Sequence, residues 1–489
     1  MEKLITPAHR NRANAVIFCS LLLFASIRGF ASCNAVSSNK VNDADTSVTT
    51  LIQQYLNSGK EPLLYYPNSV KRFYQGNGYQ AAWVNRQDDS KQTWEAMMLL
   101  DCVLQYGLSH DDYHPKALLY DPLHTMIEEP GKISNSKKAR FDILLTDALI
   151  TFINNVHYGK LNPWYAAEKI DGDMTLPFHA ETVLMNARRQ PDMANAIVSV
   201  QPRSKQYLAM QDRMRLLKGQ YQEDCYAVPD SEVHKIAINM ERLRWADIGG
   251  SGYIQINIPI YTLKFYQPDT VYEFKVVVGK TSAPTPTLNS EITYFTTSPE
   301  WKIPQKILVN EIIPKALKYN DYIENSHFSI YDKGGNYITP DRTNLLKVKR
   351  NPQLYYARQS SGCDNALGQL VFRFANVYDI YLHDTPEQQL FGRTERAFSH
   401  SCIRVEQAQH LAELMLKRGG DSDKIAVLTK AMKNHLTKNI SFSRPVPIKI
   451  TYLTCEVKEG VVYNYKDIYE LDKSLELALY STPQTLTMQ

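Results

Sequence analysis

A histidine and a cysteine in the stretch from Tyr381 to Val405, YLHDTPEQQLFGRTERAFSHSCIRV, could together perform acyl transfer. The thiolate of Cys402 would be the nucleophile, and the imidazole of His383 could take the thiol proton and return it to a leaving amine. The backbone N–H groups of Ser401 and Cys402 could bind the oxyanion that forms. A small buried thiol and a structural histidine would give the same spacing, so the residues alone leave both interpretations open.

Zinc binding is a further alternative, because His400 and Cys402 are close in sequence. The spacings that usually accompany protein-bound zinc, such as CxxC or HxxxH, do not occur with these residues. We therefore expect neither a metal nor another cofactor at this position.

The elements around the two residues are expected to place them in a β-rich region. Apolar residues alternate with others through 370–383, which predicts strands with one buried face, and His383 shares the opposite face with Tyr381 and Asp379. Apolar residues then recur every three or four positions through 405–415, which predicts a helix that ends at Gly419-Gly420. Cys402 should therefore lie in a turn that leads into a helix N-terminus, whose partial positive charge would lower the pKa of the thiol.

The motif Ser399-His400-Ser401-Cys402-Ile403-Arg404, preceded by His383, resembles the signature of the L,D-transpeptidases with a YkuD-type catalytic domain. That resemblance implies that Cys402 is the nucleophile and that His383 is the general base and acid. Ser401 stands where the family has glycine. If the backbone there requires a positive φ, a serine would be strained.

The same resemblance suggests which other side chains contact the substrate: Tyr381, Ser399, His400 and Arg404. Tyr381 shares a face with His383 and could orient the substrate, and Arg404 could meet a stem-peptide carboxylate through charge-assisted hydrogen bonds.

The resemblance implies that the partners are peptidoglycan stem peptides, one as acyl donor and one as acceptor. Cys402 would attack the carbonyl of the third residue of a tetrapeptide, D-Ala would leave, and an amine of another stem would resolve the thioester into a 3→3 cross-link. Water as acceptor would give an L,D-carboxypeptidase, and a protein lysine would give a protein-anchoring enzyme. The family also implies acylation by carbapenems. A catalytically silent wall-binding scaffold protein remains a separate alternative, in which Ser401 would mark a degraded site.

Composition is that of an ordinary globular protein long enough for two or three domains. The chain has 489 residues, 44% hydrophobic residues and a formal net charge of +4. Because the charges form no block of one sign, we expect no nucleic-acid partner.

Residues 1–33 are expected to be an export signal, with a basic start followed by an apolar run that is short for a membrane span. The segment ending at Cys33 resembles a loose lipoprotein signal. Lipidation of Cys33, ordinary cleavage and an uncleaved anchor all remain open. The lipid and the uncleaved anchor are the only membrane associations that we expect. Each places the chain in the periplasm or cell envelope. Residues 34–50 are polar and are expected to be a linker.

Five cysteines follow the signal, and their odd number leaves at least one thiol free: Cys102, Cys225, Cys363, Cys402 and Cys455. The pairing of the other four is left open, as is the possibility that all five are reduced.

Residues 51–230 are expected to form a helical domain, because their apolar stripes have helical spacing. The group His110, Asp111, Asp112 and His114 would suit a metal, but a loop after Gly107-Leu108 is the better explanation. FYQGNGYQAAWV, YGLSHDDYH and LLTDALITFINNVHYGKLNP resemble the scaffold of the large YcbB-like L,D-transpeptidases. The peptidoglycan-binding module common in that branch does not fit into residues 195–230, so we expect it to be absent.

Residues 231–480 are expected to form the catalytic domain, followed by a tail at 481–489. Alternation at Ile254, Ile256, Ile258 and Ile260, and again through 272–278, predicts strands. Residues 305–368 lack such alternation and resemble the capping subdomain of the YcbB-like branch, which would cover the site and exclude water. The expected fold is therefore α+β, with a helical scaffold domain followed by a β-rich catalytic domain carrying an inserted helical cap.

Overall fold

The computed structural model describes residues 47–58, 63–84, 90–129, 131–218, 230–246 and 248–480. The expected export signal with Cys33, most of the polar linker, Cys225 and the tail at 481–489 lie outside these residues. Within the described part of the chain, no helix is both long and apolar enough to cross a membrane.

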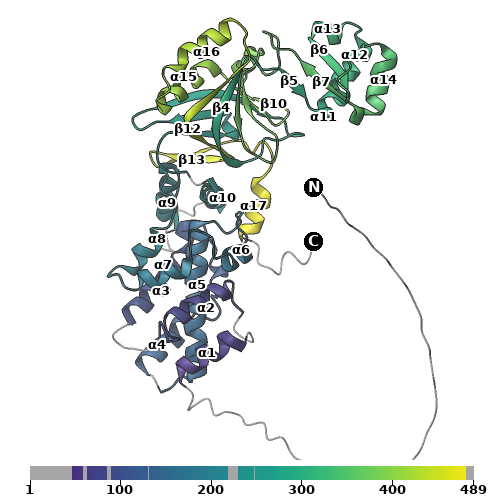
Figure 1. The fold of residues 1–489 in the computed structure, drawn as a ribbon. Coiled ribbons are helices and arrows are strands. Elements are labelled where there is room, and N and C mark those ends of the chain that lie inside the picture. The colour runs from purple at the N-terminus through teal and green to yellow at the C-terminus, as the bar shows by residue number, and fades with distance from the viewer. Residues whose placement is uncertain are drawn as a thin grey trace, which may run out of the picture. The chain divides into compact units, whose positions relative to one another are not determined.

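Among the described residues from 48 to 246, every regular element is a helix (Figure 1). The α-helices are α1 (Val48–Ser58), α2 (Pro67–Gly76), α3 (Ser90–Asp101), α4 (Tyr120–Glu128), α5 (Asn135–His157), α6 (Ala167–Gly172), α7 (Ala180–Ala187), α8 (Met193–Val198), α9 (Lys205–Lys218) and α10 (Asp230–Ala246).

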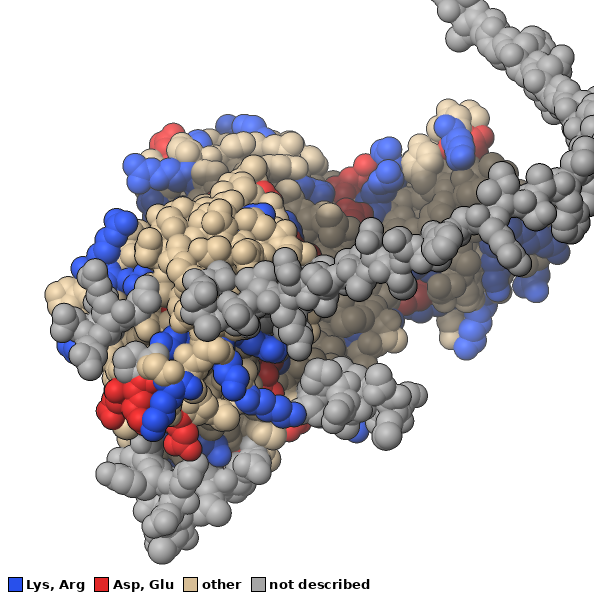
Figure 2. Space-filling view, turned by 90° about the horizontal axis from the view of Figure 1, so that it is seen from below, with Lys and Arg blue, Asp and Glu red and all other residues tan. Residues whose placement is uncertain are grey.

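Basic and acidic side chains are interspersed on the face drawn in Figure 2.

The centre of this region is α5, whose residues are buried on nearly every side between the other helices. Its Asp142 is fully buried and accepts hydrogen bonds from the amides of Ala82, Trp83 and Val84 at 2.8, 2.7 and 3.1 Å. The Tyr74 hydroxyl donates a fourth at 2.5 Å. A buried carboxylate is stable only with such partners, so Asp142 fixes the loop after α2 to the core.

Residues His110–Asp112 form a short 3₁₀ turn, and Tyr113 and His114 follow it directly. The Nε2 atom of His114 lies 2.7 Å from the Asp147 carboxylate, and Lys160 donates to Asp112 at 2.7 Å. The acidic groups here are thus satisfied by protein partners. Among the described residues, no group of three or more His, Cys, Asp or Glu side chains could hold a metal ion.

A nine-stranded sheet dominates the chain after 250, in the order β10-β3-β11-β9-β8-β4-β12-β1-β2, and β2 also pairs with β3. Its strands are β1 (Tyr253–Asn257), β2 (Thr262–Tyr266), β3 (Val271–Gly279), β4 (Leu288–Thr297), β8 (Leu370–Phe374), β9 (Leu382–His383), β10 (Ala397–Ser399), β11 (Ile403–Val405) and β12 (Lys438–Thr451). The sheet brings β9 and β11, which flank the two candidate catalytic residues, side by side as parallel neighbours.

Two helices cover part of this sheet, α15 (Ala408–Gly419) and α16 (Lys424–Lys433), and both pack against β12 (Figure 1). A hairpin, β13 (Cys455–Lys458) with β14 (Val461–Asn464), and the helix α17 (Asp472–Tyr480) complete the described chain. Gly420 has φ 81° and ends α15, as the sequence predicts.

Three sequence predictions about these elements are wrong in detail. The strand expected through Ile260 stops at Asn257, and the residues Ile258–Ile260, which include Pro259, form a 3₁₀ turn. The strand pattern through 370–383 is interrupted by a loop between β8 and β9. The helix expected from 405 begins only at Ala408, because 403–405 is strand β11.

The inserted cap contains a small sheet as well as helices. Its strands have the order β5-β7-β6, namely β5 (Trp301–Ile303), β7 (Tyr355–Gln359) and β6 (Phe328–Asp332). Its helices are α11 (Gln305–Ile307), a π-helical turn at Leu308–Ile312, α12 (Ile313–Lys318), α13 (Tyr322–Asn325) and α14 (Arg342–Arg350), which share a separate apolar core with the sheet. The α+β fold class, with a helical region followed by a β-rich domain, is confirmed.

Candidate active site

One cavity of about 1170 Å³ is lined by every residue that the sequence singled out for the site: Tyr381, His383, Ser399, His400, Ser401, Cys402 and Arg404. The cap contributes Trp301, Glu311, Tyr355 and Tyr356 to the same walls. Residues far apart in the chain thus converge on a single hollow that has a thiol and an imidazole in its lining.

Cys402 lies in the turn between β10 and β11, not at a helix N-terminus. Its neighbour Ile403 starts β11 and donates its amide to the carbonyl of Tyr381 at 3.1 Å. Because the strand and the turn at 406–407 separate Cys402 from α15, the dipole of that helix cannot stabilise the thiolate, since such effects fade within one turn. The expected cause of an activated thiol is therefore wrong.

His383 ends β9 and is buried, with 4% of its surface exposed. Its Nδ1 atom lies 2.5 Å from the carbonyl oxygen of Asp384, so Nδ1 carries the proton and donates it. In that tautomer Nε2 carries the lone pair that can accept a proton, and the backbone of Leu367 makes a second hydrogen bond to the ring. Burial, reinforced by the charge of Arg404, lowers the pKa of His383 to about 3, so the ring is neutral at neutral pH.

The thiol of Cys402 is also neutral in this environment. Burial raises its pKa to about 11, and nearby Asp379 acts in the same direction. Hydrogen bonds from the amide and hydroxyl of Tyr381 and the charge of Arg404 oppose that rise without cancelling it. The resting groups are therefore a neutral thiol and a neutral imidazole that line one cavity. If His383 acts as the base, it takes the proton as the thiol attacks.

Ser401 has φ 80°, in the left-handed region that favours glycine. The strain that the sequence made conditional on a positive φ is therefore present. Its Oγ donates to the carbonyl of Ala283 at 3.3 Å, and its own carbonyl accepts from the Thr285 hydroxyl at 2.8 Å. These bonds hold the turn, and within the described residues the amides of Ser401 and Cys402 donate to no protein acceptor.

Ser399 closes the turn around the cysteine, because its hydroxyl donates to the carbonyl of Cys402. Its side chain is buried, and this hydrogen bond uses its donor. The geometry thus gives Ser399 a structural contact in addition to the expected substrate contact.

His400 bonds to the cap. Its Nε2 donates to the carboxylate of Glu311 in the π-helical turn, and Lys280 lies 3.6 Å from the same carboxylate. Partial burial would raise the pKa of Glu311, but the hydrogen bond from His400 and the charge of Lys280 hold it below its usual value. Glu311 is therefore ionised and accepts from Nε2 of His400, which also lies 3.1 Å from the Nζ atom of Lys280.

Arg404 faces His383 in the strand register and forms an ion pair with Glu387. Its Nε is buried and has no hydrogen-bond partner within the described residues. Tyr381 packs edge-on against His383, with ring centroids 5.8 Å apart, and the guanidinium of Arg373 lies 5.4 Å from the Tyr381 centroid. Arg404 and Arg373 thus bring positive charge to the cavity that an anionic substrate group could use.

Sequence reasoning missed Glu311, Lys280, Arg373 and Trp301 at this site. Glu311 and Trp301 belong to the cap, and no local pattern reveals that Glu311 meets His400. The alternation of apolar residues in β8 places Arg373 on the face opposite Phe372 and Phe374. That pattern could have identified Arg373 as a candidate site residue.

Of the cysteines after the signal, Cys102, Cys363, Cys402 and Cys455 are free thiols in the structure, and Cys225 lies outside the described residues. The candidate nucleophile, Cys402, therefore has a free thiol and forms no disulfide.

Comparisons with known proteins agree with the fold. Residues 68–214 match the family described as Scaffold domain, and residues 251–427 match YkuD, the L,D-transpeptidase catalytic domain. A Haemophilus influenzae protein named "Putative L,D-transpeptidase" is 34% identical over 250 residues. These cover 50% of this chain and 49% of that protein, so the chain matches about half the length of this curated relative.

The site thus lies within a YkuD, L,D-transpeptidase catalytic, domain. The chain combines this domain with a Scaffold domain, which is the YcbB-like architecture.

Proposed function

We propose that this protein is a peptidoglycan L,D-transpeptidase that uses Cys402 as nucleophile and His383 as general base and acid. In the first half-reaction, the Sγ atom of Cys402 attacks the carbonyl of the third residue of a stem tetrapeptide, and Nε2 of His383 takes the thiol proton. The amides of Ser401 and Cys402 hold the oxyanion. The C–N bond to D-Ala then breaks, and His383 returns the proton to the leaving amine.

In the second half-reaction, the side-chain amine of a second stem attacks the thioester carbonyl. His383 accepts a proton from this amine, the C–S bond breaks, and Cys402 takes back a proton as the thiol. The product is a 3→3 cross-link, and the enzyme returns to its starting state. The third donor residue would be meso-diaminopimelate, whose free carboxylate could pair with Arg404 or Arg373.

The observation that carries this proposal is the assigned tautomer of His383 in a cavity shared with Cys402. With Nδ1 donating to the carbonyl of Asp384, Nε2 is the ring nitrogen that we assign to the thiol proton. The low pKa of His383 suits a base that is always deprotonated before attack, and a thiol that stays protonated until attack resists oxidation at rest.

Product analysis tests the proposal. Purified residues 34–489 and the variant Cys402→Ala are each incubated with disaccharide-tetrapeptide, and the products are separated and weighed by mass spectrometry. Loss of D-Ala with a 3→3 dimer, in the wild type only, is the expected result.

Other outcomes select the alternatives. Tripeptide without dimer would make the protein an L,D-carboxypeptidase, and transfer only to an added lipoprotein lysine would make it a protein-anchoring enzyme. Absence of product together with a Cys402 that a carbapenem does not acylate would point to a silent wall-binding scaffold.

We also propose that the chain is exported to the periplasm or cell envelope, because the basic start and apolar run of residues 1–33 have the order of a secretory signal. Mass spectrometry of the mature N-terminus distinguishes lipidation of Cys33 from ordinary cleavage. A protein recovered from the cytoplasm with residues 1–33 intact would refute export.

A further inference from the structure

Three hollows follow one another from the catalytic cavity towards the scaffold helices. The catalytic cavity, of about 1170 Å³, shares Tyr378 with a second hollow of about 610 Å³. The second shares Trp164, Trp245 and Asn289 with a third of about 220 Å³. We call the second and third hollows together the aromatic groove. A succession of linked hollows suits an extended polymer better than one compact ligand.

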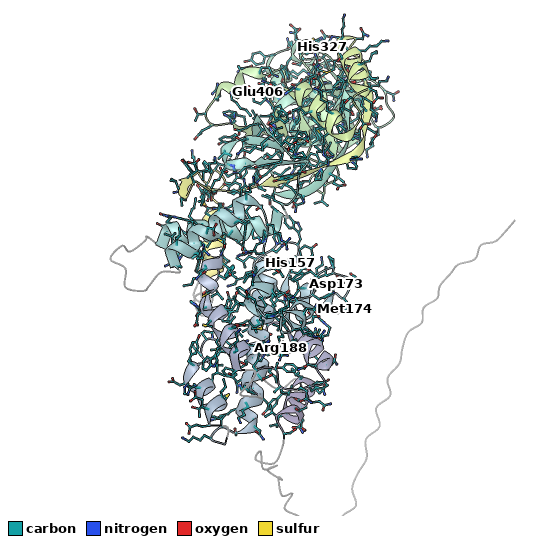
Figure 3. The ribbon with its side chains drawn as sticks, turned by 90° about the vertical axis from the view of Figure 1, so that its left-hand side faces the viewer. His157, Asp173, Met174, Arg188, His327 and Glu406 are labelled. Atoms are coloured by element: carbon teal, nitrogen blue, oxygen red, sulfur yellow. The ribbon has the colours of Figure 1, made fainter. Side chains whose placement is uncertain are left out.

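Exposed aromatic rings line this groove. Trp164 is 39% exposed and Tyr378 is 53% exposed, with Tyr165 between Trp164 and the α6 helix. Single exposed apolar side chains are common, whereas exposed apolar side chains that gather around one hollow with a polar rim mark binding sites. Figure 3 labels His157, at the C-terminal end of α5, which belongs to the same lining.

The loop that carries Trp164 is held by hydrogen bonds. The Oδ1 atom of Asn162 accepts from the Trp164 amide at 3.0 Å, and its Nδ2 donates to the carbonyl of Tyr158 at 2.7 Å. Lys169 donates to the carbonyl of Trp164 at 3.3 Å. The indole is thus presented on a fixed backbone, which reduces the entropy lost on binding.

The loop that carries Tyr378 is fixed in a similar way. Asn376 donates to the carbonyls of Phe374 and Ile380 and accepts from the amides of Tyr378 and Ile380, at distances from 2.9 to 3.1 Å. These four bonds from one side chain hold in place a loop whose Val377 is 92% exposed. Burial does not explain an apolar residue and an aromatic ring held out in solvent, whereas contact with a ligand does.

We propose that the aromatic groove binds the glycan strand of the substrate, a polymer of N-acetylated sugars, while the attached stem peptide enters the catalytic cavity past Tyr378. A pyranose ring has an apolar face of C–H groups and a rim of hydroxyl and amide groups. Trp164 and Tyr378 supply faces for the C–H groups. The Oδ1 atom of Asn289 can accept from the polar rim, while its Nδ2 donates to the carbonyl of Trp245 at 3.0 Å. This assignment rests on the proposed function, because it places the glycan of the same substrate.

The test is binding of chitotetraose, the tetramer of N-acetylglucosamine, to residues 34–489 by isothermal titration calorimetry. Binding by the wild type, weakened about tenfold or more in Trp164→Ala and in Tyr378→Ala, is expected from the loss of one stacked ring. Tyr463→Ala is the matched control, because Tyr463 is 49% exposed on β14 and does not line the groove. Unchanged thermal unfolding of each variant establishes that it is folded.

A second readout uses the reaction. The ratio of kcat/KM for disaccharide-tetrapeptide to kcat/KM for the free tetrapeptide should fall in Trp164→Ala and not in Tyr463→Ala. Wild type that does not bind chitotetraose, or Trp164→Ala that binds it equally well, would overturn the groove assignment even if cross-links form. Binding without any cross-linking would instead leave the groove in place and reject the proposed transpeptidase reaction.

Discussion

Alkylation of Cys402 by iodoacetamide is expected to be slow at neutral pH and to accelerate steadily as the pH rises. The pKa of the Cys402 thiol is raised to about 11, whereas the pKa of a cysteine in an unfolded chain is about 8.5. At pH 7.5 the folded protein then has about 300-fold less thiolate at this position. A thiolate of higher pKa is intrinsically more nucleophilic, which recovers about tenfold. The net expectation is alkylation about 30-fold slower than in the unfolded chain.

The assay measures the alkylated fraction of the Cys402 peptide by mass spectrometry at several times and at each pH from 5 to 10. The same protein in urea gives the unfolded reference, and Cys363, which is exposed and free, controls for reagent concentration in every sample. Because the thiolate fraction rises with pH up to about 11, the rate should increase about tenfold per pH unit between 7 and 10.

A rate that is independent of pH between 5 and 8 would refute this reasoning, because it would mean that Cys402 exists as a thiolate paired with a protonated imidazole. The pKa of His383 is lowered to about 3, so the base is deprotonated throughout pH 5–8. The plot of kcat/KM against pH should therefore show no decrease on the acid side from this residue in that range. A fall in kcat/KM below pH 6.5 that is abolished in a His383 variant would contradict the assignment.

Three further predictions concern single residues. Ser401→Gly should be more stable to urea than Ser401→Ala by about 1 kcal/mol or more, because only glycine adopts φ 80° without strain, and equal stabilities would argue against that conformation. Asp142→Asn should lower the free energy of unfolding by about 2 kcal/mol or more, because one amide oxygen cannot serve three buried N–H groups, and an unchanged urea midpoint would contradict this. His383→Gln should slow acylation of Cys402 by a carbapenem by about 10²- to 10⁴-fold, measured by intact mass, and wild-type acylation rates would remove His383 from the mechanism.

The catalytic motif was predictable from sequence because it is local. His383 and Cys402 lie on either side of one loop, and the parallel pairing of β9 with β11 brings those ends of the loop together. The alternation that predicted β3 and the glycine that ends α15 are likewise local signals. A buried strand face and a left-handed residue at a helix end each depend on only a few neighbouring residues, so the sequence pattern predicts both.

The cause of the pKa shifts could not be predicted in the same way. The helix expected after Cys402 starts three residues late, because Ile403 and Val405 are β-branched residues that complete the sheet between β3 and β9. Because β11 lies between Cys402 and α15, the helix dipole does not act on the thiol. The thiol is buried instead, and burial raises its pKa. Glu311 reaches His400 from a π-helical turn in the cap, and only the folded cap places the two side chains together.

The measurement that most directly tests the central claim is rapid-quench mass spectrometry of the protein mixed with disaccharide-tetrapeptide, followed by digestion. The account predicts a peptide containing Cys402 that carries the donor less its terminal D-Ala, appearing before the cross-linked product and disappearing as that product forms. Release of D-Ala that persists in Cys402→Ala, with no adduct on Cys402 at any time, would contradict it.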